Sequence, residues 1–374
     1  MSARHRTNLF LGFAFVLISM TAAADLPLAQ ISLPPGFTIE RWARVDNARQ
    51  MALGQHDQNG GTLFVGSTSA GKVHAVSFGA NFKVQRVTTV ARGLQLPMGV
   101  AYRDGSLYVS AVSRILRYDK IEQRLENPPE ATLVTDRLPS ETHHGGRFIA
   151  FGPDGKLYVP IGAPCNICEP DAQRHANILR MNADGSAQEI YARGVRNSVG
   201  FDWQPPTSAL WFTDNGRDQL GDDLPPDELN HAPTAAMHFG YPYCHGGDLP
   251  DPDFGAKRRC EEFTAPAQKL GAHVAALGMR FYTGKMFPPA YRNQIFIAEH
   301  GSWNRSKKTG YRITLVRLQG NKAISYETFA SGWLKDETVR GRPADVLTLP
   351  DGSLLVSDDH AGAIYRIVYH DPPD

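Results

Sequence analysis

Arginine and asparagine residues recur in short motifs along the chain, and their chemistry suits an anion-binding site. Arg196 and Asn197 stand together in the motif GVRNSVGFDW, while Arg49 and Arg342 lie near the two ends of the chain. A guanidinium group binds a carboxylate through two parallel hydrogen bonds. Several such groups around one site would bind a small, planar ligand that carries more than one carboxylate.

Histidines accompany these arginines. His143 and His144 precede Arg147 in the motif HHGGR, and His300 lies in the motif AEHGSWNR. A neutral histidine with a pKa of about 6.5 can accept a proton at physiological pH. The histidines therefore add general-base chemistry to the predicted anion site, unless they only cap the strands beside them.

An acidic stretch, residues 214–228, has the sequence DNGRDQLGDDLPPDE. Carboxylate and carbonyl oxygens are the hard ligands that calcium prefers. The stretch is a candidate calcium site, and the alternative interpretation is a solvated acidic turn.

Six similar stretches, each a turn followed by a short apolar strand, would position these residues. They are centred on Leu63, Leu107, Leu157, Leu210, Ile295 and Leu354. The intervals between them are 44, 50, 53, 85 and 59 residues. A period of roughly 40–50 residues is typical of a propeller in which each repeat forms one blade. We therefore predict an all-β fold, a six-bladed β-propeller of four-stranded antiparallel blades.

The predicted blades would bring the arginines and histidines to one face. Two antiparallel strands joined by a turn place the start of the first strand and the end of the second at the same edge. Arg49, His143, Arg196 and Arg342 open first strands, and His300 closes a second strand. The turns of the Pro-Asp-Gly type fall at the opposite edge. The face with the arginines is therefore the predicted site, and a solvated polar rim is the alternative.

Composition and charge narrow the class of protein. The chain has 374 residues and a formal net charge of +1, which gives no reason to expect a nucleic acid as partner. Its 35 glycines and 26 prolines supply many turns. We predict a single propeller domain over residues 25–374. The long interval of 85 residues indicates an inserted, ordered loop at about residues 216–275.

The first 24 residues are predicted to be a signal peptide. A basic start is followed by an apolar run over residues 9–20 and by small residues that end at Ala24. A run of this length does not easily span a bilayer, although an uncleaved anchor is the alternative. The sequence predicts a periplasmic or secreted protein with no membrane span after cleavage.

The chain contains four cysteines, and an even number in an exported protein favours disulfides. Proximity in the sequence pairs Cys165 with Cys168 and Cys244 with Cys260. Glu169, not a histidine, follows Cys168, so this is not a haem attachment motif. A zinc site of four cysteines is the alternative to the disulfides.

Taken together, the motifs resemble those of the soluble PQQ-dependent sugar dehydrogenases, which include glucose, sorbosone and fungal pyranose dehydrogenases. The resemblance rests on HHGGR with the following FGPDGKLYV, on GVRN, on WFTDNG with the downstream DELN, and on AEHGSWNR. It extends from LPPGF at residues 33–37 to IYRI at residues 364–367. The pieces GSWNR and CNIC look closer to the sorbosone-dehydrogenase-like branch than to the glucose enzymes.

The resemblance implies roles for single residues. His143, four positions before Arg147, matches the catalytic base of the family, and His144 is the competing choice. Arg196 and Asn197 match the pair that contacts the quinone in the family.

Further cofactor contacts follow from the same resemblance. Arg342 matches a cofactor-binding arginine of the last blade better than Arg340 does. Arg49 is a further contact to a cofactor carboxylate, and His300 takes the place of a lysine of the glucose enzymes.

The resemblance also concerns the metal and the substrate. Gly216 and Arg217 match positions whose main-chain carbonyls hold calcium, although the glucose enzymes have a proline at the second position. Thr142 stands where those enzymes have an aspartate, which leaves the substrate preference open.

The implied reaction is the oxidation of a sugar by hydride transfer to PQQ. Calcium would act as Lewis acid, His143 as general base, and Arg196 would stabilise negative charge on the C5 oxygen. The partners would be a sugar and an external electron acceptor, a quinone or a cytochrome. Two other classes stay open: a calcium-dependent lactone hydrolase of the gluconolactonase type, and a non-catalytic periplasmic propeller that binds a protein or a glycan.

Overall fold

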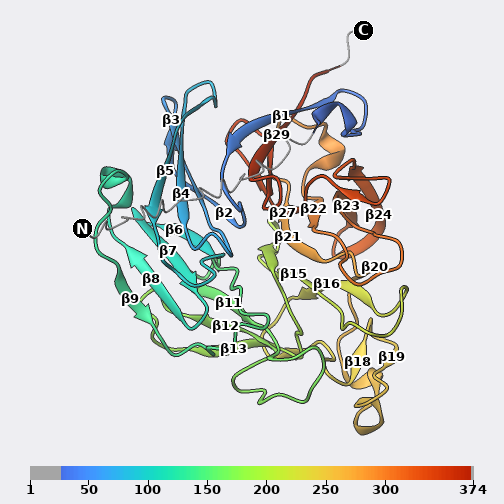
Figure 1. Cartoon of the computed structure of the whole chain (residues 1–374). Coiled ribbons are helices and arrows are strands. Elements are labelled where there is room, and N and C mark those ends of the chain that lie inside the picture. The colour runs from blue at the N-terminus through green and yellow to red at the C-terminus, as the bar shows by residue number, and fades with distance from the viewer. Residues whose placement is uncertain (1–26, 372–374) are drawn as a thin grey trace, which may run out of the picture.

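The computed structural model describes residues 27–371, which form an all-β fold without an α-helix. Six sheets follow one another around a ring, in the order of the chain (Figure 1). This architecture is the six-bladed β-propeller that the repeats predict. The predicted signal peptide, residues 1–24, lies outside the described residues. The helical elements in the described range are the short 3-10 helices η1 (Leu28–Gln30), η2 (Ile121–Arg124), η3 (Gly255–Lys257), η4 (Cys260–Glu262) and η5 (Pro289–Tyr291).

The first two blades use four consecutive strands each, and the third adds a fifth strand from farther along the chain. The first blade consists of β2 (Met51–Asp57), β3 (Gly60–Val65), β4 (Val73–Gly79) and β5 (Val84–Ala91). The second blade consists of β6 (Val100–Arg103), β7 (Ser106–Ala111), β8 (Arg114–Tyr118) and β9 (Thr132–Thr135). The third blade consists of β10 (Ala150–Phe151), β11 (Leu157–Ile161), β12 (Asn177–Met181), β13 (Glu189–Arg193) and, parallel to β13, the short β17 (Met237–His238).

The other three blades have four strands each. The fourth blade consists of β14 (Gly200–Trp203), β15 (Leu210–Asp214), β16 (Pro226–Ala232) and β20 (Gln268–Ala272). The fifth blade consists of β21 (Ala276–Phe281), β22 (Ile295–Glu299), β23 (Arg312–Gln319) and β24 (Lys322–Ala330). The sixth blade consists of β27 (Pro343–Thr348), β28 (Leu354–Asp358), β29 (Ala363–Tyr369) and β1 (Phe37–Arg44).

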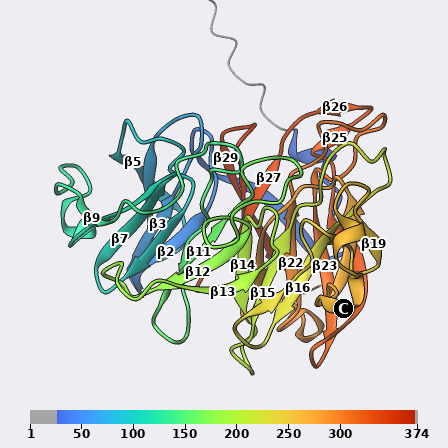
Figure 2. The same ribbon diagram turned by 90° about the horizontal axis from the view of Figure 1, so that it is seen from below.

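Two small hairpins complete the described sheets. They are formed by β18 (Cys244–His245) with β19 (Leu249–Pro250), and by β25 (Leu334–Lys335) with β26 (Thr338–Val339). The view turned by 90° shows the blades side by side, with β25 and β26 beyond the ends of the blade strands (Figure 2).

Each repeat motif forms the second strand of its blade, and its central apolar residue is fully buried. Leu63 of β3, for example, packs in one cluster with Val76 of its own blade and Leu355 of the sixth blade. The core therefore lies between neighbouring blades, and full burial of a leucine stabilises the fold by about 1.5–3 kcal/mol. Because each blade packs on the next, the chain needs no single large core.

The sixth blade joins the two ends of the described chain. Strand β1 pairs with β29, with Phe37 opposite Tyr369 and Arg44 opposite Ala363 (Figure 1). The N-terminal strand therefore completes the last sheet and closes the ring, which leaves fewer unpaired strand edges.

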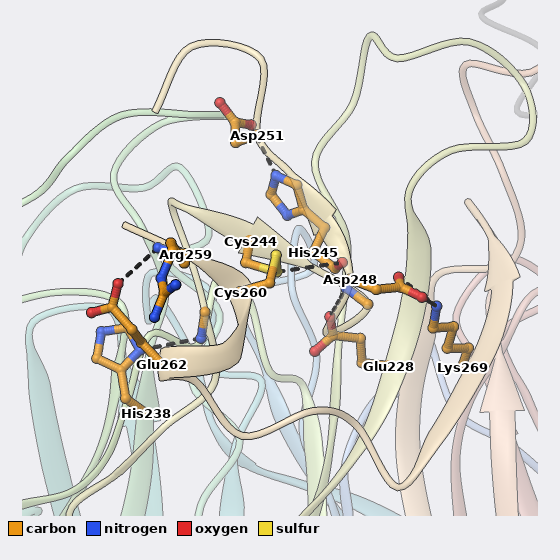
Figure 3. The surroundings of a disulfide bond; sticks show 12 residues. Glu228, His238, Cys244, His245, Asp248, Asp251, Arg259, Cys260, Glu262 and Lys269 are labelled. Carbon is orange, nitrogen blue, oxygen red and sulfur yellow. Dashed lines mark hydrogen bonds and ion pairs between the residues drawn. A yellow bond between two sulfur atoms is a disulfide. The ribbon is translucent and has the colours of Figure 1, made fainter. Parts of the chain in front are cut away.

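Residues 216–275 differ from the single long loop that the sequence suggests. They contain β16 and β20, which are the two outer strands of the fourth blade. The insertion proper is the excursion between these strands, which carries β17, β18 and β19. The predicted disulfide between Cys244 and Cys260 forms within it (Figure 3). The second predicted disulfide joins Cys165 to Cys168.

Buried hydrogen bonds connect the blades near the ring centre. The side-chain amide of Gln50 donates to the carbonyl of Ile149 at 2.7 Å and accepts from the N–H of Val100 at 3.2 Å. Asp345 accepts from the N–H of Met51 at 2.9 Å. Because buried polar groups need partners, these bonds fix the positions of neighbouring blades. The blades in turn fix the segments that line the cavity.

Candidate active site

A cavity of about 440 Å³ opens at one end of the ring. It lies where first strands begin and second strands end, which is the edge that the sequence predicts. The structure brings Arg49, Arg196, Asn197, His300 and Arg342 to this cavity. Its volume is typical of a small-molecule site.

Arg196 is buried, and neutral oxygen atoms hold its guanidinium. Nε donates to the carbonyl of Asn166 at 2.8 Å, Nη2 to the side-chain oxygen of Asn166 at 2.8 Å, and Nη1 to the carbonyl of Asn215 at 3.0 Å. Nη2 also lies 3.5 Å from a carboxylate oxygen of Asp218. Burial lowers the pKa of Arg196, but an arginine keeps its charge in proteins. The result is a fixed positive group at the cavity.

The turn that carries Arg196 and Asn197 is held by the end of β15. The carboxylate of Asp214 accepts from the backbone N–H of Arg196 at 2.8 Å and from that of Asn197 at 2.6 Å. Asn215 donates from its side chain to the carbonyl of Asn197 at 2.9 Å. Asp214 and Asn215, at the end of β15, therefore hold the turn that carries Arg196 and Asn197. Burial and the charge of Glu228 raise the pKa of Asp214 to about 8.

Arg49 and His300 share one carboxylate, that of Asp359. One oxygen of Asp359 lies 2.7 Å from Nη2 of Arg49, and the other lies 2.8 Å from Nε2 of His300. Burial lowers the pKa of His300 to about 4, against the opposing effect of Asp359. Burial raises the pKa of Asp359, but the charges of Arg49 and His300 outweigh it and bring the pKa below its usual range.

Sequence reasoning missed Asp359, although a signal was present. It is the last residue of the motif LPDGSLLVSDD and directly follows β28. The rule that second strands end at the cavity edge therefore applies to it as it does to His300. Asp218, which belongs to the acidic stretch 214–228 that the sequence analysis identifies, also lines the cavity.

Arg342 reaches the cavity from the start of β27. Nε donates to the carbonyl of His300 at 3.1 Å, and Nη2 donates to the carbonyl of Gly301 at 2.7 Å. Gly301 has a φ of +99°, a conformation that favours glycine. Within residues 27–371, Arg342 forms no ion pair with a carboxylate. Arg340, the other choice from the sequence, is exposed and does not line the cavity.

The two neighbouring histidines occupy different environments. His144 lines the cavity, and its Nδ1 lies 2.8 Å from the carbonyl oxygen of Ala163, so Nδ1 carries the proton. Gly162 leaves room for it, because a Cβ there would lie 2.5 Å from the Cβ of His144. His143 is exposed and is not among the lining residues; its ring centre lies 4.1 Å from that of His144.

Arg147 holds the segment that carries both histidines. It is buried, and its guanidinium donates to the carbonyls of His144 at 2.9 Å and of Pro139 at 3.2 Å. Burial lowers its pKa to about 10. The arginine of the HHGGR motif therefore supports the loop instead of contacting a ligand.

Gly216 and Arg217, the two residues predicted to hold calcium, differ in their relation to the cavity. Gly216 lines the cavity, and its N–H donates to a carboxylate oxygen of Asp227 at 2.9 Å. The side chain of Arg217 is directed away, toward Asp251 at 2.7 Å and Asp253 at 3.1 Å. In the described part of the chain, no group of three or more His, Cys, Asp or Glu side chains could hold a metal ion. A calcium ion here would depend on main-chain carbonyls.

Two cavity residues have buried polar atoms without a hydrogen-bond partner in the structure. They are Nε of Arg49, a donor, and Oδ1 of Asn304, an acceptor. A buried group of this kind costs about 1–3 kcal/mol when it is left unsatisfied. Together with the guanidinium groups, the unpaired donor of Arg49 fits a ligand that presents carboxylate oxygens.

The fold and the cavity define a class: six-bladed propellers with a cationic small-molecule site at one end of the ring. The chain belongs to the Glucose / Sorbosone dehydrogenase family, whose model matches residues 102–366. It is also similar to an uncharacterized protein of Borreliella burgdorferi, with 36% identity over 369 residues and 95% of both chains covered.

Solved structures share the fold. One is the calcium structure of a carbohydrate-active enzyme of family AA12 from Trichoderma reesei, with a TM-score of 0.79, 20% identity, and coverage of 94% of this chain and 100% of that one. Another is the holo form of the PQQ domain of pyranose dehydrogenase from Coprinopsis cinerea, with a TM-score of 0.75, 18% identity, and coverage of 90% and 97%.

Proposed function

We propose that the protein oxidises a sugar, with PQQ as bound cofactor and an external quinone or cytochrome as electron acceptor. The observation that carries this proposal is the convergence of Arg49, Arg196 and Arg342 on one cavity. Guanidinium groups suit a planar cofactor that carries carboxylates and quinone oxygens. Membership of a family of sugar dehydrogenases supports the proposal, as does the PQQ named for the Coprinopsis enzyme. When bound, PQQ supplies an ortho-quinone that accepts a hydride.

The arginines have separate tasks. Arg342 and Arg49 bind carboxylates, with the unpaired Nε of Arg49 as one donor. Arg196 and Asn197 lie at the reacting end, where Arg196 stabilises negative charge as it develops. A positive group held in advance by Asn166 and Asn215 needs little reorganisation during the reaction.

His143 acts as general base and removes the proton of the sugar hydroxyl. Its neighbour His144 is less suited, because burial and the charge of Arg196 lower the pKa of His144 to about 2. A base works best when its pKa lies near the working pH. His144 instead lines the cavity, with its ring centre 4.1 Å from that of His143.

Calcium is part of the proposal, with the carbonyls of Gly216 and Arg217 as ligands. The calcium named for the Trichoderma structure supports this choice. Chelation with EGTA should lower the turnover of the PQQ-loaded protein, and added calcium should restore it. Unchanged turnover after complete chelation would remove calcium from the mechanism.

The substrate class is an aldose, an osone or a related pyranose, and the sorbosone-like branch is favoured by the motifs GSWNR and CNIC. Trp303 lies at the cavity with 75% of its surface exposed and offers an aromatic face to a sugar ring. An exported location agrees with the two disulfides. None of the helices in residues 27–371 is long and apolar enough to cross a membrane.

Reconstitution tests the function directly. Purified protein is mixed with PQQ and calcium, and a panel of aldoses and osones is assayed with an artificial dye as electron acceptor. We expect a near-ultraviolet absorption band of bound PQQ and sugar-dependent reduction of the dye. Hydrolysis of a sugar lactone without that band would establish the hydrolase instead, and neither activity would favour a binding propeller.

A further inference from the structure

The loop closed by the disulfide between Cys165 and Cys168 contacts Arg196 from behind the cavity wall. Asn166 lies inside this four-residue loop and is not among the residues that line the cavity. Its carbonyl oxygen and its side-chain oxygen both accept from the guanidinium of Arg196, each at 2.8 Å. One residue therefore makes two of the hydrogen bonds that orient this arginine.

Asn166 also connects Arg196 to the segment after β15. Its side-chain oxygen accepts from the backbone N–H of Asp218 at 2.8 Å, and its side-chain nitrogen donates to the carbonyl of Asp218 at 3.3 Å. The side chain of Asp218 in turn accepts from Asn304 at 2.6 Å. Asn166 is thus the common partner of two cavity residues that come from different parts of the chain.

The disulfide loop itself is attached to the inserted segment. The backbone N–H of Cys168 donates to the hydroxyl oxygen of Tyr241 at 3.1 Å, and Cys165 and Ile167 pack against Tyr241 and Ala163. These contacts fix both ends of the loop, so that the position of Asn166 follows from the fold.

We propose that Asn166, presented by the disulfide loop, is a positioning residue that sets the orientation of the Arg196 guanidinium toward the cavity. The proposal rests on the function proposed above only for its consequence in catalysis. The two bonds to Asn166 and the bond to the carbonyl of Asn215 together fix the plane of the guanidinium, and the side chain of Asn166 supplies one of these three bonds.

The first test needs no cofactor. In the apo-protein, the exchange of the Arg196 side-chain N–H groups with water is measured by NMR, with the Arg196→Lys variant as assignment control. We expect Asn166→Ala to speed this exchange about tenfold or more, because a hydrogen bond to a charged group is lost. Asn166→Asp keeps an acceptor oxygen at the same place and should restore slow exchange.

A matched control tests whether the effect depends on the place of the asparagine in the structure and not only on the loss of an asparagine side chain. Asn182 lies in the turn after β12, at the blade edge opposite the cavity, where its side chain donates to Ser186 at 2.9 Å. Asn182→Ala should leave the exchange of Arg196 unchanged. The melting temperature of each variant shows whether it is folded, and Asn166→Asp provides the comparison if Asn166→Ala is not.

The second test uses PQQ. Asn166→Ala should raise the dissociation constant of PQQ and lower kcat at saturating PQQ, each by about tenfold, with both restored in part by Asn166→Asp. Exchange of Arg196 at the wild-type rate in folded Asn166→Ala would overturn the proposal. If neither the wild type nor any variant binds PQQ, the proposed function is wrong. The exchange of the Arg196 N–H groups in the apo-protein then decides whether Asn166 positions Arg196.

Discussion

The two sides of the cavity hold their cations by different means. On the Arg196 side, neutral oxygens of Asn166 and Asn215 accept the hydrogen bonds of the guanidinium, and the carboxylate of Asp218 lies farther away, at 3.5 Å. On the Asp359 side, a carboxylate pairs with Arg49 and also contacts His300. Neutral oxygens fix a cation and leave its charge available, whereas a carboxylate neutralises much of it.

This difference suggests a division of work between the sides. On the Arg196 side, the nearest carboxylate is the more distant Asp218, at 3.5 Å, so the guanidinium keeps more of its charge beside the histidine pair, where a reaction would develop negative charge. On the Asp359 side, Arg342 is the cation that forms no ion pair within residues 27–371, and it is the group best able to hold a ligand carboxylate. Chemistry and anchoring would then belong to opposite walls.

The strongest test of this division is the removal of the base. His143→Ala should lower the turnover of the reconstituted enzyme by about 10²–10⁴-fold, because general-base catalysis is lost. The dissociation constant of PQQ, measured by titration of its absorption band, should stay near that of the wild type, because the anchoring groups lie on the other side.

His144→Ala is the matched comparison for this experiment. If His143 is the base, the two variants differ, and His144→Ala retains more turnover. Near-wild-type turnover of His143→Ala, with PQQ and calcium bound, would contradict the assignment and move the base to His144.

The shared carboxylate should matter most for stability. Asp359→Asn removes the partner of Arg49 at a site where the two side chains are 8% and 16% exposed. Breaking such a pair leaves a poorly solvated charge, so we expect the free energy of unfolding in urea to fall by about 3 kcal/mol.

A surface pair provides the control. Asp46 lies 3.7 Å from Lys72, with side chains 68% and 39% exposed. Asp46→Asn should change the free energy of unfolding by no more than about 0.5 kcal/mol, because exposed ion pairs contribute little. Equal effects of the two substitutions would show that Asp359 is not a structural partner of Arg49.

Loss of the anchoring arginine should act on binding more than on chemistry. Arg342→Ala removes a charged donor, so the dissociation constant of PQQ should rise about 10–100-fold. The value of kcat at saturating PQQ should change much less. Titration of both quantities checks this, with Arg340→Ala as control because Arg340 is exposed. Equal affinity in Arg342→Ala and wild type would contradict the anchoring role.

The sequence predicted the fold and much of the cavity because both depend on local patterns. A turn followed by an apolar strand recurs six times, and strand direction alone decides which residues meet at one edge. Arg49, Arg196 and Arg342 reach the cavity for this reason. The disulfide pairs followed from proximity, since each joins cysteines close in the chain.

Other features depend on contacts between distant segments, which no local pattern encodes. Asn166 contacts Arg196 and Asp218 from a disulfide loop on which Tyr241 of the insertion packs. The strands β16 and β20 inside the expected loop were missed because the excursion between them interrupts the repeat. The resemblance favoured His143 over His144 but did not predict their different exposure, and His144 adopts a left-handed conformation, with a φ of +50°.

The two sides should also respond to pH in opposite directions, although the effect is smaller than those above. Burial raises the pKa of Glu228, behind the Arg196 side, from 4.5 to about 7. Its contribution to stability is therefore present at low pH and is lost as the pH rises toward 7. Burial lowers the pKa of His300, on the Asp359 side, from 6.5 to about 4. Its contribution is present above pH 6.5 and is lost as the pH falls toward 4.

Between these pH limits, the folded and unfolded states differ by up to one bound proton at each group. Each group therefore changes the free energy of unfolding by up to about 1.4 kcal/mol per pH unit. Urea unfolding from pH 5 to pH 6.5 checks this on Glu228→Gln and His300→Asn. Relative to the wild type, stability should rise more steeply with pH in Glu228→Gln, because a term that falls with pH is removed. It should rise less steeply in His300→Asn, because a term that rises with pH is removed. Slopes that shift in the same direction in both variants would show that the two walls are not electrostatic opposites.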